Sequence, residues 1–330
     1  MRRKILEVKD LSISFRSADS SVTAVDRISF YVNEGETLGI VGESGCGKSV
    51  TSLAVMRLLP LETARTEGSI VFDGIDLLKL PAEKMHDVRG NRISMVFQEP
   101  MTSLNPVYTI GKQIDEAILL HKNISAGEAR KLTLEMLKKV EIPRGEAICR
   151  EYPYQLSGGM RQRVMIAMAL ACGPKMLIAD EPTTALDVTI QAQILDLMRQ
   201  IRSKMETSII LITHDLGVIA EMCERVVVMY AGQIVEEADV GNLMDNPRHP
   251  YTVGLMRSIP QYDIKVSRLV PIPGQVPSLS NMPPGCRFAP RCPKVMQKCL
   301  TEKPQLLPME DGYKCRCWLY EEGGESGGTR

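Results

Sequence analysis

The sequence predicts an α/β fold that is built around a phosphate-binding loop and ends in an irregular, cysteine-rich segment. The run GESGCGKS, at residues 42–49, fits the pattern G-x-x-x-x-G-K-[ST] at every defined position. Short apolar runs alternate with stretches of helical periodicity along most of the 330 residues, which is typical of a doubly wound parallel sheet. Of the nine cysteines, five lie between Cys286 and Cys317.

The first part of the chain predicts strands that lead into the phosphate loop. Alternating apolar residues predict strands at residues 5–8, 11–15 and 22–32, and the turn residues Asn33, Glu34 and Gly35 end the last of these. An apolar strand at residues 37–41 precedes the loop, and a helical run at residues 50–59 follows it. This strand, loop and helix order is the context that phosphate binding requires.

The middle of the chain predicts further strands and two helical regions. Strands are expected at residues 69–72 and 93–97, and helices within residues 109–140 and 160–171. Wholly apolar runs at residues 176–179, 209–213 and 226–229 predict strands that are buried on both faces of a parallel sheet. After about residue 251 the chain becomes proline-rich and irregular, and residues 323–330 predict a frayed Gly- and Ser-rich tail.

The composition narrows the classes of function. The 40 basic and 40 acidic residues cancel, so no overall field would recruit nucleic acid or an anionic membrane, and we expect no nucleic-acid partner. No apolar run approaches the ~20 residues that a membrane span needs, and the charged start MRRKILEVKD lacks the apolar region of a secretory signal. We therefore expect a cytoplasmic location.

Each residue type of the predicted phosphate loop suits a role in binding phosphate or Mg²⁺. Glycines allow positive φ, so that backbone N–H groups turn toward one concavity where a polyphosphate such as ATP can bind. Lys48 is expected to reach the β and γ phosphates, and the Ser49 hydroxyl is expected to hold Mg²⁺. The residues that would cradle the nucleotide through their backbone are Gly42, Ser44, Gly45, Cys46 and Gly47; the Cys46 side chain is incidental.

Four polar residues follow predicted strands, where ligands of open α/β sheets bind. Asp180 would hold Mg²⁺ through water, and Glu181 would orient or deprotonate the attacking water. His214 could sense the γ-phosphate, and Gln98 is placed to reach Mg²⁺ or the attacking water. Taken alone, a histidine such as His214 more often has a structural role.

The run LSGGMRQRVMIAMAL at residues 156–170 carries a family resemblance. It places Ser157, Gly158 and Gly159 at the start of a helix, where free N–H groups and the helix dipole favour an anion. Together with the other motifs, in their expected order over about residues 5–250, it resembles the LSGGQ signature of ATP-binding cassette (ABC) ATPases. Met160 replaces the glutamine of that signature.

The resemblance implies a P-loop NTPase (ABC ATPase) core with an antiparallel β subdomain and a helical subdomain at about residues 100–170. It implies a nucleotide-binding domain at residues 1–255 and a Pro- and Cys-rich appendix at residues 256–330. Gln98 then falls in the Q-loop, residues 184–187 in the D-loop, and His214 becomes the switch histidine. Phe15 stacks on adenine or, alternatively, belongs to the core.

The resemblance also implies partners. In the family, the signature of one subunit covers the ATP at the phosphate loop of another, so a second ABC ATPase is expected. The runs QEPMTSLNP, HPYTVGLM and PGQVPSL resemble ATP-binding subunits of dipeptide, oligopeptide and nickel importers. Two membrane permeases, contacted through residues 99–111, and an extracytoplasmic solute-binding protein are then expected at the cytoplasmic face of the inner membrane. A soluble ABC ATPase that acts on DNA or ribosomes is the rival interpretation.

The cysteine-rich segment predicts a metal site. Cys286, Cys292, Cys299 and Cys317 supply four soft thiolates with no histidine nearby, which suits a [4Fe-4S] cluster or Zn²⁺, with free thiols as the remaining alternative. The text PPGCRFAPRCP resembles the C-terminal segment of peptide importer ATPases, some of which hold such a cluster. Cys315 is a further candidate, and a structural role is preferred to a redox role.

Overall fold

The computed structural model describes residues 2–321 except 17–20, 99–102, 185 and 259–270. The described chain divides into two compact units, which are treated separately below. Unit 1 comprises residues 1–6, 32–37 and 71–212, and unit 2 comprises residues 7–31, 38–70 and 213–330. Among the described residues, we find no helix that is both long and apolar enough to cross a membrane.

Each predicted apolar run falls on a strand, whereas β5, β10, β11 and β12 were not predicted. The strand bounds are β1 Lys4–Arg16, β2 Ser21–Asn33, β3 Thr37–Val41, β4 Ala64–Phe72, β5 Ile75–Asp76, β6 Ile93–Val96, β7 Met176–Asp180, β8 Ser208–Thr213, β9 Arg225–Tyr230, β10 Gln233–Asp239, β11 Leu307–Pro308 and β12 Lys314–Cys315.

The helices are mostly short outside the middle of the chain. The α-helices are α1 Lys48–Val55, α3 Ile110–His121, α4 Ala126–Lys139, α5 Gly145–Ile148, α6 Gly158–Leu170, α7 Val188–Met205, α8 Leu216–Met222, α9 Val240–Asp245, α10 Pro250–Arg257 and α11 Gln297–Thr301. The 3-10 turns are η1 Ala82–Met85, η2 Pro153–Gln155, η3 Ala289–Arg291, η4 Glu310–Gly312 and η5 Trp318–Tyr320.

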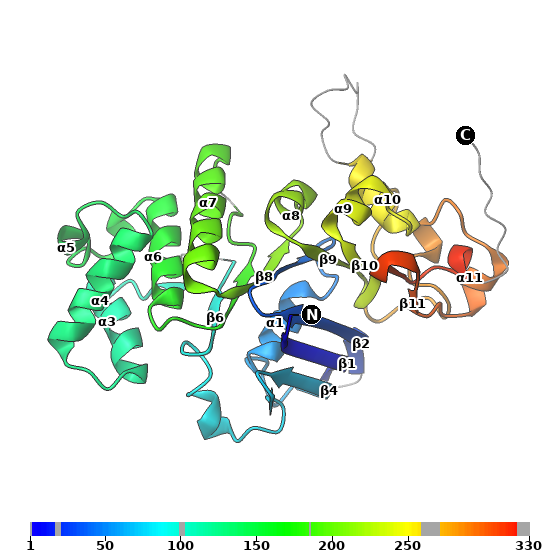
Figure 1. Ribbon diagram of the computed structural model, residues 1–330. Helices are drawn as coiled ribbons and strands as arrows, with labels where there is room; N and C mark the ends of the chain where they lie inside the picture. The colour runs from blue at the N-terminus through cyan, green and yellow to red at the C-terminus, as the bar shows by residue number, and fades with distance from the viewer. Residues whose placement is uncertain (1, 17–20, 99–102, 185, 259–270, 322–330) are drawn as a thin grey trace. The chain divides into compact units, whose positions relative to one another are not determined.

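Unit 1 combines parallel strands with a group of helices. β6 pairs in parallel with β7, and β7 pairs in parallel with β8, with Ala179 opposite Val96 on one side and Leu211 on the other. All residues of β7 and β8 are buried, as the wholly apolar runs predict. Helices α3, α4 and α6 pack on one another, and α5 packs on α4 (Figure 1).

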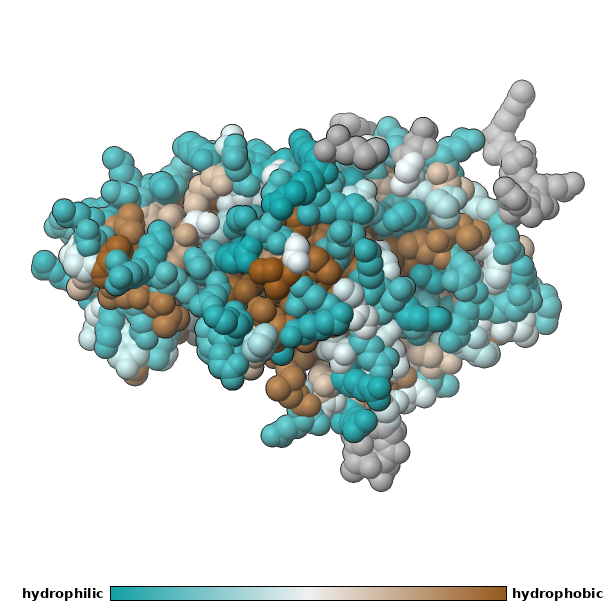
Figure 2. All heavy atoms as spheres, turned by 60° about the horizontal axis from the view of Figure 1, so that its bottom comes forward, coloured by the Kyte–Doolittle hydropathy of each residue, from teal (hydrophilic) through white to brown (hydrophobic). Residues whose placement is uncertain are grey.

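The helices of unit 1 carry a surface groove that is lined by both apolar and charged side chains. It has a volume of about 570 Å³ and is lined by Tyr108 and by residues of α3 and α4, including Leu119 and Leu120. Leu120 is 73% exposed, and nearby Val107 is 71% exposed. Figure 2 shows apolar side chains gathered at the surface over these helices.

Unit 2 contains the phosphate loop and the C-terminal segment. β3 pairs in parallel with β9, β10 pairs antiparallel with β9, and the short strand β12 adds to the free edge of β10 and pairs with β11. One hydrophobic core joins Val41 of β3 and Val228 of β9 with Tyr251, Phe288 and Tyr313 from beyond the cassette motifs. The C-terminal segment therefore packs on the same core as the strand that carries the phosphate loop.

Two strand predictions need correction. Residues 5–8 and 11–15 were expected as separate strands, but both lie in β1, which continues through Asp10 at a φ of 47°. The sequence analysis missed β10, because Glu236 and Glu237 interrupt its apolar pattern although both are buried. Glu237 pairs with Arg225 and Lys314, so its charge is neutralised inside the sheet. The predicted domain boundary at residues 255/256 stays a prediction.

Asp73 links three segments of unit 1 by ion pairs. Its carboxylate accepts hydrogen bonds from Arg3, Arg92 and Lys175, with Oδ1 at 2.8 Å from Arg3 and Oδ2 at 2.7 Å from Lys175. The carboxylate side chain is 9% exposed. The Lys175 ammonium, together with these arginines, lowers the pKa of Asp73 to about 2.

We expect Asp73→Asn to lower the free energy of unfolding at pH 7 by about 1–3 kcal/mol, because charge-assisted hydrogen bonds are lost. The pKa of Asp73 is lower in the folded state than in the unfolded chain, so its contribution is complete above the unfolded pKa. It is lost as pH falls from about 4 toward 2. Urea unfolding at pH 7 and near pH 3 measures both effects. Asp87→Asn is the control, since its pair with Lys84 is exposed.

Candidate nucleotide site

Glycines of the phosphate loop are required by its backbone path. Gly45 and Gly47 have φ values of 77° and 101°, in the left-handed region that favours glycine. A Cβ atom on Gly42 would lie 2.2 Å from the carbonyl oxygen of Met229, so any side chain there would collide with the backbone at the end of β9. The loop therefore passes directly against β9. Close packing requires a glycine at position 42, and backbone conformation favours glycine at positions 45 and 47.

The Lys48 side chain points into the phosphate loop, and its neighbours differ in how far they are buried. The Lys48 ammonium lies inside the loop, where Nζ donates to the carbonyl oxygens of Gly42 at 2.7 Å and Glu43 at 3.1 Å. The Cys46 side chain is buried, its Sγ lies 3.8 Å from Lys48 Nζ, and burial raises the pKa of its thiol. Ser44 and Gly45 are exposed, and Ser49 lies half-buried in the first turn of α1.

The turn between β9 and β10 is hydrogen-bonded to the phosphate loop. The Gly232 N–H donates to the carbonyl oxygen of Cys46 at 3.0 Å, and the Gly232 carbonyl accepts from the Asp26 N–H at 2.9 Å. Arg287, which follows Cys286, donates to the carbonyl oxygen of Ala231 in the same turn and to Asp26 Oδ2 at 2.6 Å. The C-terminal segment thus binds the turn on which the loop rests.

Two residues that sequence reasoning missed bind the loop directly. Arg291 forms a bidentate ion pair with the Glu43 carboxylate, with distances of 2.7 and 3.0 Å. The Glu43 N–H donates to the Tyr251 hydroxyl at 2.8 Å. Both residues lie in runs that carry the importer resemblance, HPYTVGLM and PPGCRFAPRCP, so the signal was present but no role was assigned to it.

The predicted catalytic residues of unit 1 meet at the ends of β6 and β7. Asp180 ends β7 and is 4% exposed. Gln98 Nε2 donates to Glu181 Oε2 at 2.9 Å, and Thr184 Oγ1 donates to the same oxygen at 2.9 Å. Glu181 has a φ of 48°, a conformation that is rare outside glycine and that concentrates at functional sites. The structure therefore brings Gln98 and Glu181 together, as a water-positioning pair requires.

The signature run starts helix α6 of unit 1. Ser157 is the N-cap residue, and its hydroxyl accepts from the Met160 N–H at 3.4 Å, so the replacement of the family's glutamine leaves this contact intact. A Cβ atom on Gly159 would lie 2.9 Å from Ile190 of α7. Ser157 and Gly158 are exposed, which leaves the N-terminus of α6 accessible to an anion.

The cysteines of the C-terminal segment are buried or half-buried. Burial, together with Cys286, Cys292 and Cys299, raises the pKa of Cys317 to about 12. Burial also raises the pKa of Cys315, and Glu236 and Cys317 contribute in the same direction. Within the part of the chain that the structure describes, no group of three or more His, Cys, Asp or Glu residues is placed to hold a metal ion. The structure therefore does not support the predicted metal centre at Cys286, Cys292, Cys299 and Cys317.

Comparison with known proteins settles the family. Residues 25–184 match the family described as ABC transporter, and residues 235–299 match the oligopeptide/dipeptide transporter C-terminal region. The chain is 54% identical to the oligopeptide transport ATP-binding protein AppD of Bacillus subtilis, over 97% of this chain and 98% of that protein. The chain belongs to the ATP-binding subunits of the oligopeptide/dipeptide ABC transporter family. It is therefore an ABC-type ATPase.

Further relatives agree with this assignment. This ATPase is 50% identical to the dipeptide transport ATP-binding protein DppD of Bacillus subtilis, over 98% of this chain and 96% of that protein. Among solved structures, a dimeric post-hydrolysis state of the ATP-binding cassette MJ0796 bound to ADP and Pi is similar at a TM-score of 0.64. That match has 28% identity and covers 71% of this chain and 98% of the other.

The structure also gives positions for the other predicted site residues of this ATPase. His214 follows β8 and is exposed, and Phe15 is half-buried near the end of β1, so neither the adenine contact nor a core role is decided. In the expected D-loop, Asp187 caps helix α7 by accepting from the Ile190 N–H at 2.9 Å. Ala185 of that loop and residues 99–102 of the expected permease contact lie outside the described residues.

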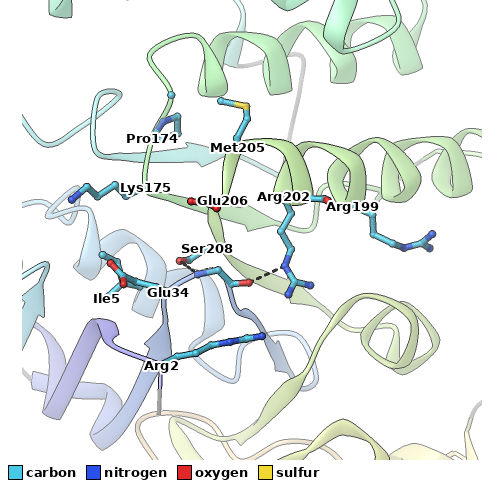
Figure 3. A pocket seen from close by; sticks show the side chains of 13 residues that line it. Arg2, Ile5, Glu34, Pro174, Lys175, Arg199, Arg202, Met205, Glu206 and Ser208 are labelled. Atoms are coloured by element: carbon cyan, nitrogen blue, oxygen red, sulfur yellow. Dashed lines mark hydrogen bonds between the residues drawn. The ribbon is translucent and has the colours of Figure 1, made fainter.

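A basic pocket of unit 1 is separate from the motif residues of this ATPase. It has a volume of about 800 Å³, and the residues that line it include Arg2, Lys175 and Arg199 but none of the predicted site residues. The Gly35 N–H donates to Ser208 Oγ at 2.9 Å, and the Gly35 carbonyl accepts from Arg202 Nε at 3.0 Å. Figure 3 shows Ser208 and Arg202 in this pocket, with dashed lines for these hydrogen bonds. These contacts tie the β2–β3 turn to β8 and α7.

We expect Gly42→Ala to weaken ATP binding and to lower the free energy of unfolding by about 3 kcal/mol, because the new methyl group must displace the backbone of β9. Gly74→Ala is the matched control, since Gly74 has a φ of 80° and an added Cβ meets nothing within 4 Å. The control should cost only the conformational strain of about 1 kcal/mol. Equal costs for the two variants in urea unfolding would contradict the packing explanation.

Proposed function

We propose that this chain hydrolyses ATP to power the import of di- or oligopeptides through a membrane ABC transporter. The observation that carries the proposal is similarity along the whole chain to peptide-transport ATP-binding proteins, including the C-terminal region at residues 235–299. A nickel importer ATPase of the same family is the alternative that the sequence resemblance leaves open. No residue of an ATP-binding subunit contacts the solute in such a transporter, so the proposed solute rests on the relatives.

In the proposed reaction, the chain's residues bind the nucleotide and position water. Lys48 would contact the β and γ phosphates, and Ser49 and Asp180 would hold Mg²⁺, which neutralises phosphate charge when bound. Glu181 would accept a proton from the attacking water, while Gln98 fixes the carboxylate that does so. His214 would contact the γ-phosphate. The buried position of Asp180 and the Gln98–Glu181 hydrogen bond support these roles.

The signature residues would act on the nucleotide of a partner. Ser157, Gly158 and Gly159 would bind the γ-phosphate held by a second ABC ATPase, so that two ATP molecules lie between the two subunits. Their accessible position at the start of α6 supports this role. Closure on ATP and opening after hydrolysis would then drive the permeases, because the two states bind ATP with different affinity.

The proposed assembly contains two permeases and receives solute from an extracytoplasmic binding protein. We propose that the chain lies at the cytoplasmic face of the inner membrane, with the helices of unit 1 toward the permeases. The groove on α3 and α4, where the exposed Leu119 and Leu120 lie beside charged side chains, supports such a contact.

We expect Glu181→Gln to keep ATP affinity but to lower kcat for hydrolysis at least about 100-fold, because the general base is removed while a similar shape remains. In cells that lack the chain, the parent should restore uptake of a labelled dipeptide, and the variant should not. ATP binding without hydrolysis should also trap the variant as a closed dimer with its partner ATPase.

Turnover of Glu181→Gln within a few-fold of the parent would refute Glu181 as the base. Proteins that co-purify with the tagged parent from mild detergent test the transport proposal independently. Two permeases and a second ABC ATPase are expected. Recovery of ribosomal or DNA-processing proteins without permeases would favour a soluble ABC ATPase instead.

We also propose that Cys286, Cys292, Cys299 and Cys317 hold a [4Fe-4S] cluster, with Zn²⁺ as the alternative. The soft, thiolate-only donor set supports this proposal. The cluster would stabilise a segment that contains only short elements between residues 271 and 321.

Anaerobically purified protein is expected to show broad visible absorbance and about four iron atoms per chain. Cys317→Ser should lose both signals, because one of the four thiolates is removed. Cys315→Ser is the control and should retain them. A colourless parent without iron would refute the cluster, and zinc in its place would support the alternative.

A further inference from the structure

We propose that Arg291 is a positioning residue for ATP binding, through which the C-terminal cysteine segment fixes the shape of the phosphate loop. The proposal rests on the proposed ATP site but names a residue outside the cassette motifs. Arg291 immediately precedes Cys292 and ends the 3-10 turn η3. Its partner Glu43 is the second residue of the phosphate loop.

The ion pair between Arg291 and Glu43 is specific in geometry. Arg291 Nη1 lies 2.7 Å from Glu43 Oε2, and Nη2 lies 3.0 Å from Oε1, so both donors of the planar guanidinium meet both carboxylate oxygens. The Arg291 side chain is 3% exposed and that of Glu43 is 30% exposed. Burial reduces screening, so this pair differs from an exposed surface pair that contributes little.

Arg291 is itself held firmly on its other side. Its Nε donates to the Pro273 carbonyl at 3.0 Å, and its Nη2 donates to the Ile272 carbonyl at 3.3 Å. The Tyr230 hydroxyl lies 3.5 Å from Nη1, and the Tyr230 ring packs against Phe288. The guanidinium therefore has three polar contacts outside the phosphate loop, which favour one position for it.

Glu43 transmits that position to the phosphate-binding residues. Its N–H donates to the Tyr251 hydroxyl, and its carbonyl accepts from Lys48 Nζ at 3.1 Å and from the Cys46 N–H at 3.3 Å. Glu43 is thus held at its side chain and its N–H by C-terminal residues, while its carbonyl contacts the lysine that would bind phosphate. Loss of the ion pair would release the carbonyl that orients Lys48.

The test compares ATP affinity with stability in the full chain. Arg291→Met keeps the apolar stem and removes the charge, and it should weaken binding of a fluorescent ATP analogue with Mg²⁺ about tenfold. Glu43→Gln should cause a similar loss, and the double variant should lose no more than either single variant. Arg291→Lys should lie between these and the parent, because an ammonium cannot reproduce the bidentate contact.

Lys298→Met is the matched control. Lys298 lies in the same cysteine segment and pairs with Glu321, but it has no contact with the phosphate loop among those found in the described residues. Its removal should leave the affinity for the analogue unchanged. A purely structural role of Arg291 would lower stability while the folded protein kept the parent affinity.

Parent-like affinity in Arg291→Met would overturn the proposal. If that variant does not fold, parent-like affinity in both Glu43→Gln and Arg291→Lys would overturn it equally. Failure of the parent itself to bind the analogue would instead refute the proposed ATP site, so the two failures are distinguishable.

Discussion

The direct contact between the phosphate loop and the backbone of β9 is the constraint on which the rest of unit 2 depends. At Gly42 the loop approaches the Met229 carbonyl so closely that no side chain fits, and at Cys46 its carbonyl is bonded to Gly232 in the next turn. A loop that packs backbone against backbone holds its N–H groups in fixed directions, which is what a preorganised anion site requires. The supporting turn must then be held equally firmly.

The C-terminal segment supplies that support, and this gives a physical reason for its presence on the chain. Arg287 binds the β9–β10 turn, and Arg291 and Tyr251 bind Glu43 of the loop. The same region shares the hydrophobic core of β3 and β9 and extends the sheet edge through β12. The segment thus packs on the cassette core and contacts both the phosphate loop and the turn beside it.

In unit 1 the polar groups concentrate where the parallel strands end. Asp180 is buried at the end of β7, and Glu181 is held in the left-handed region with its carboxylate bonded to Gln98 and Thr184. Strain of this kind persists only where the surroundings fix it, as the ladder of β7 with β6 and β8 does here. The apolar runs predicted these strands, because strands buried on both faces need apolar residues at every position.

The sequence by itself determined the parallel strands, the phosphate loop and the signature helix, since each depends on local chemistry: apolar runs, glycines and a capping serine. Only the tertiary structure decided that β10 is a buried strand despite Glu236 and Glu237, because the partners that neutralise or bond them lie far along the chain. It also decided that Arg291 and Tyr251 bind the phosphate loop. Contacts between residues about 200 or more positions apart leave no local pattern, so only the folded chain reveals them.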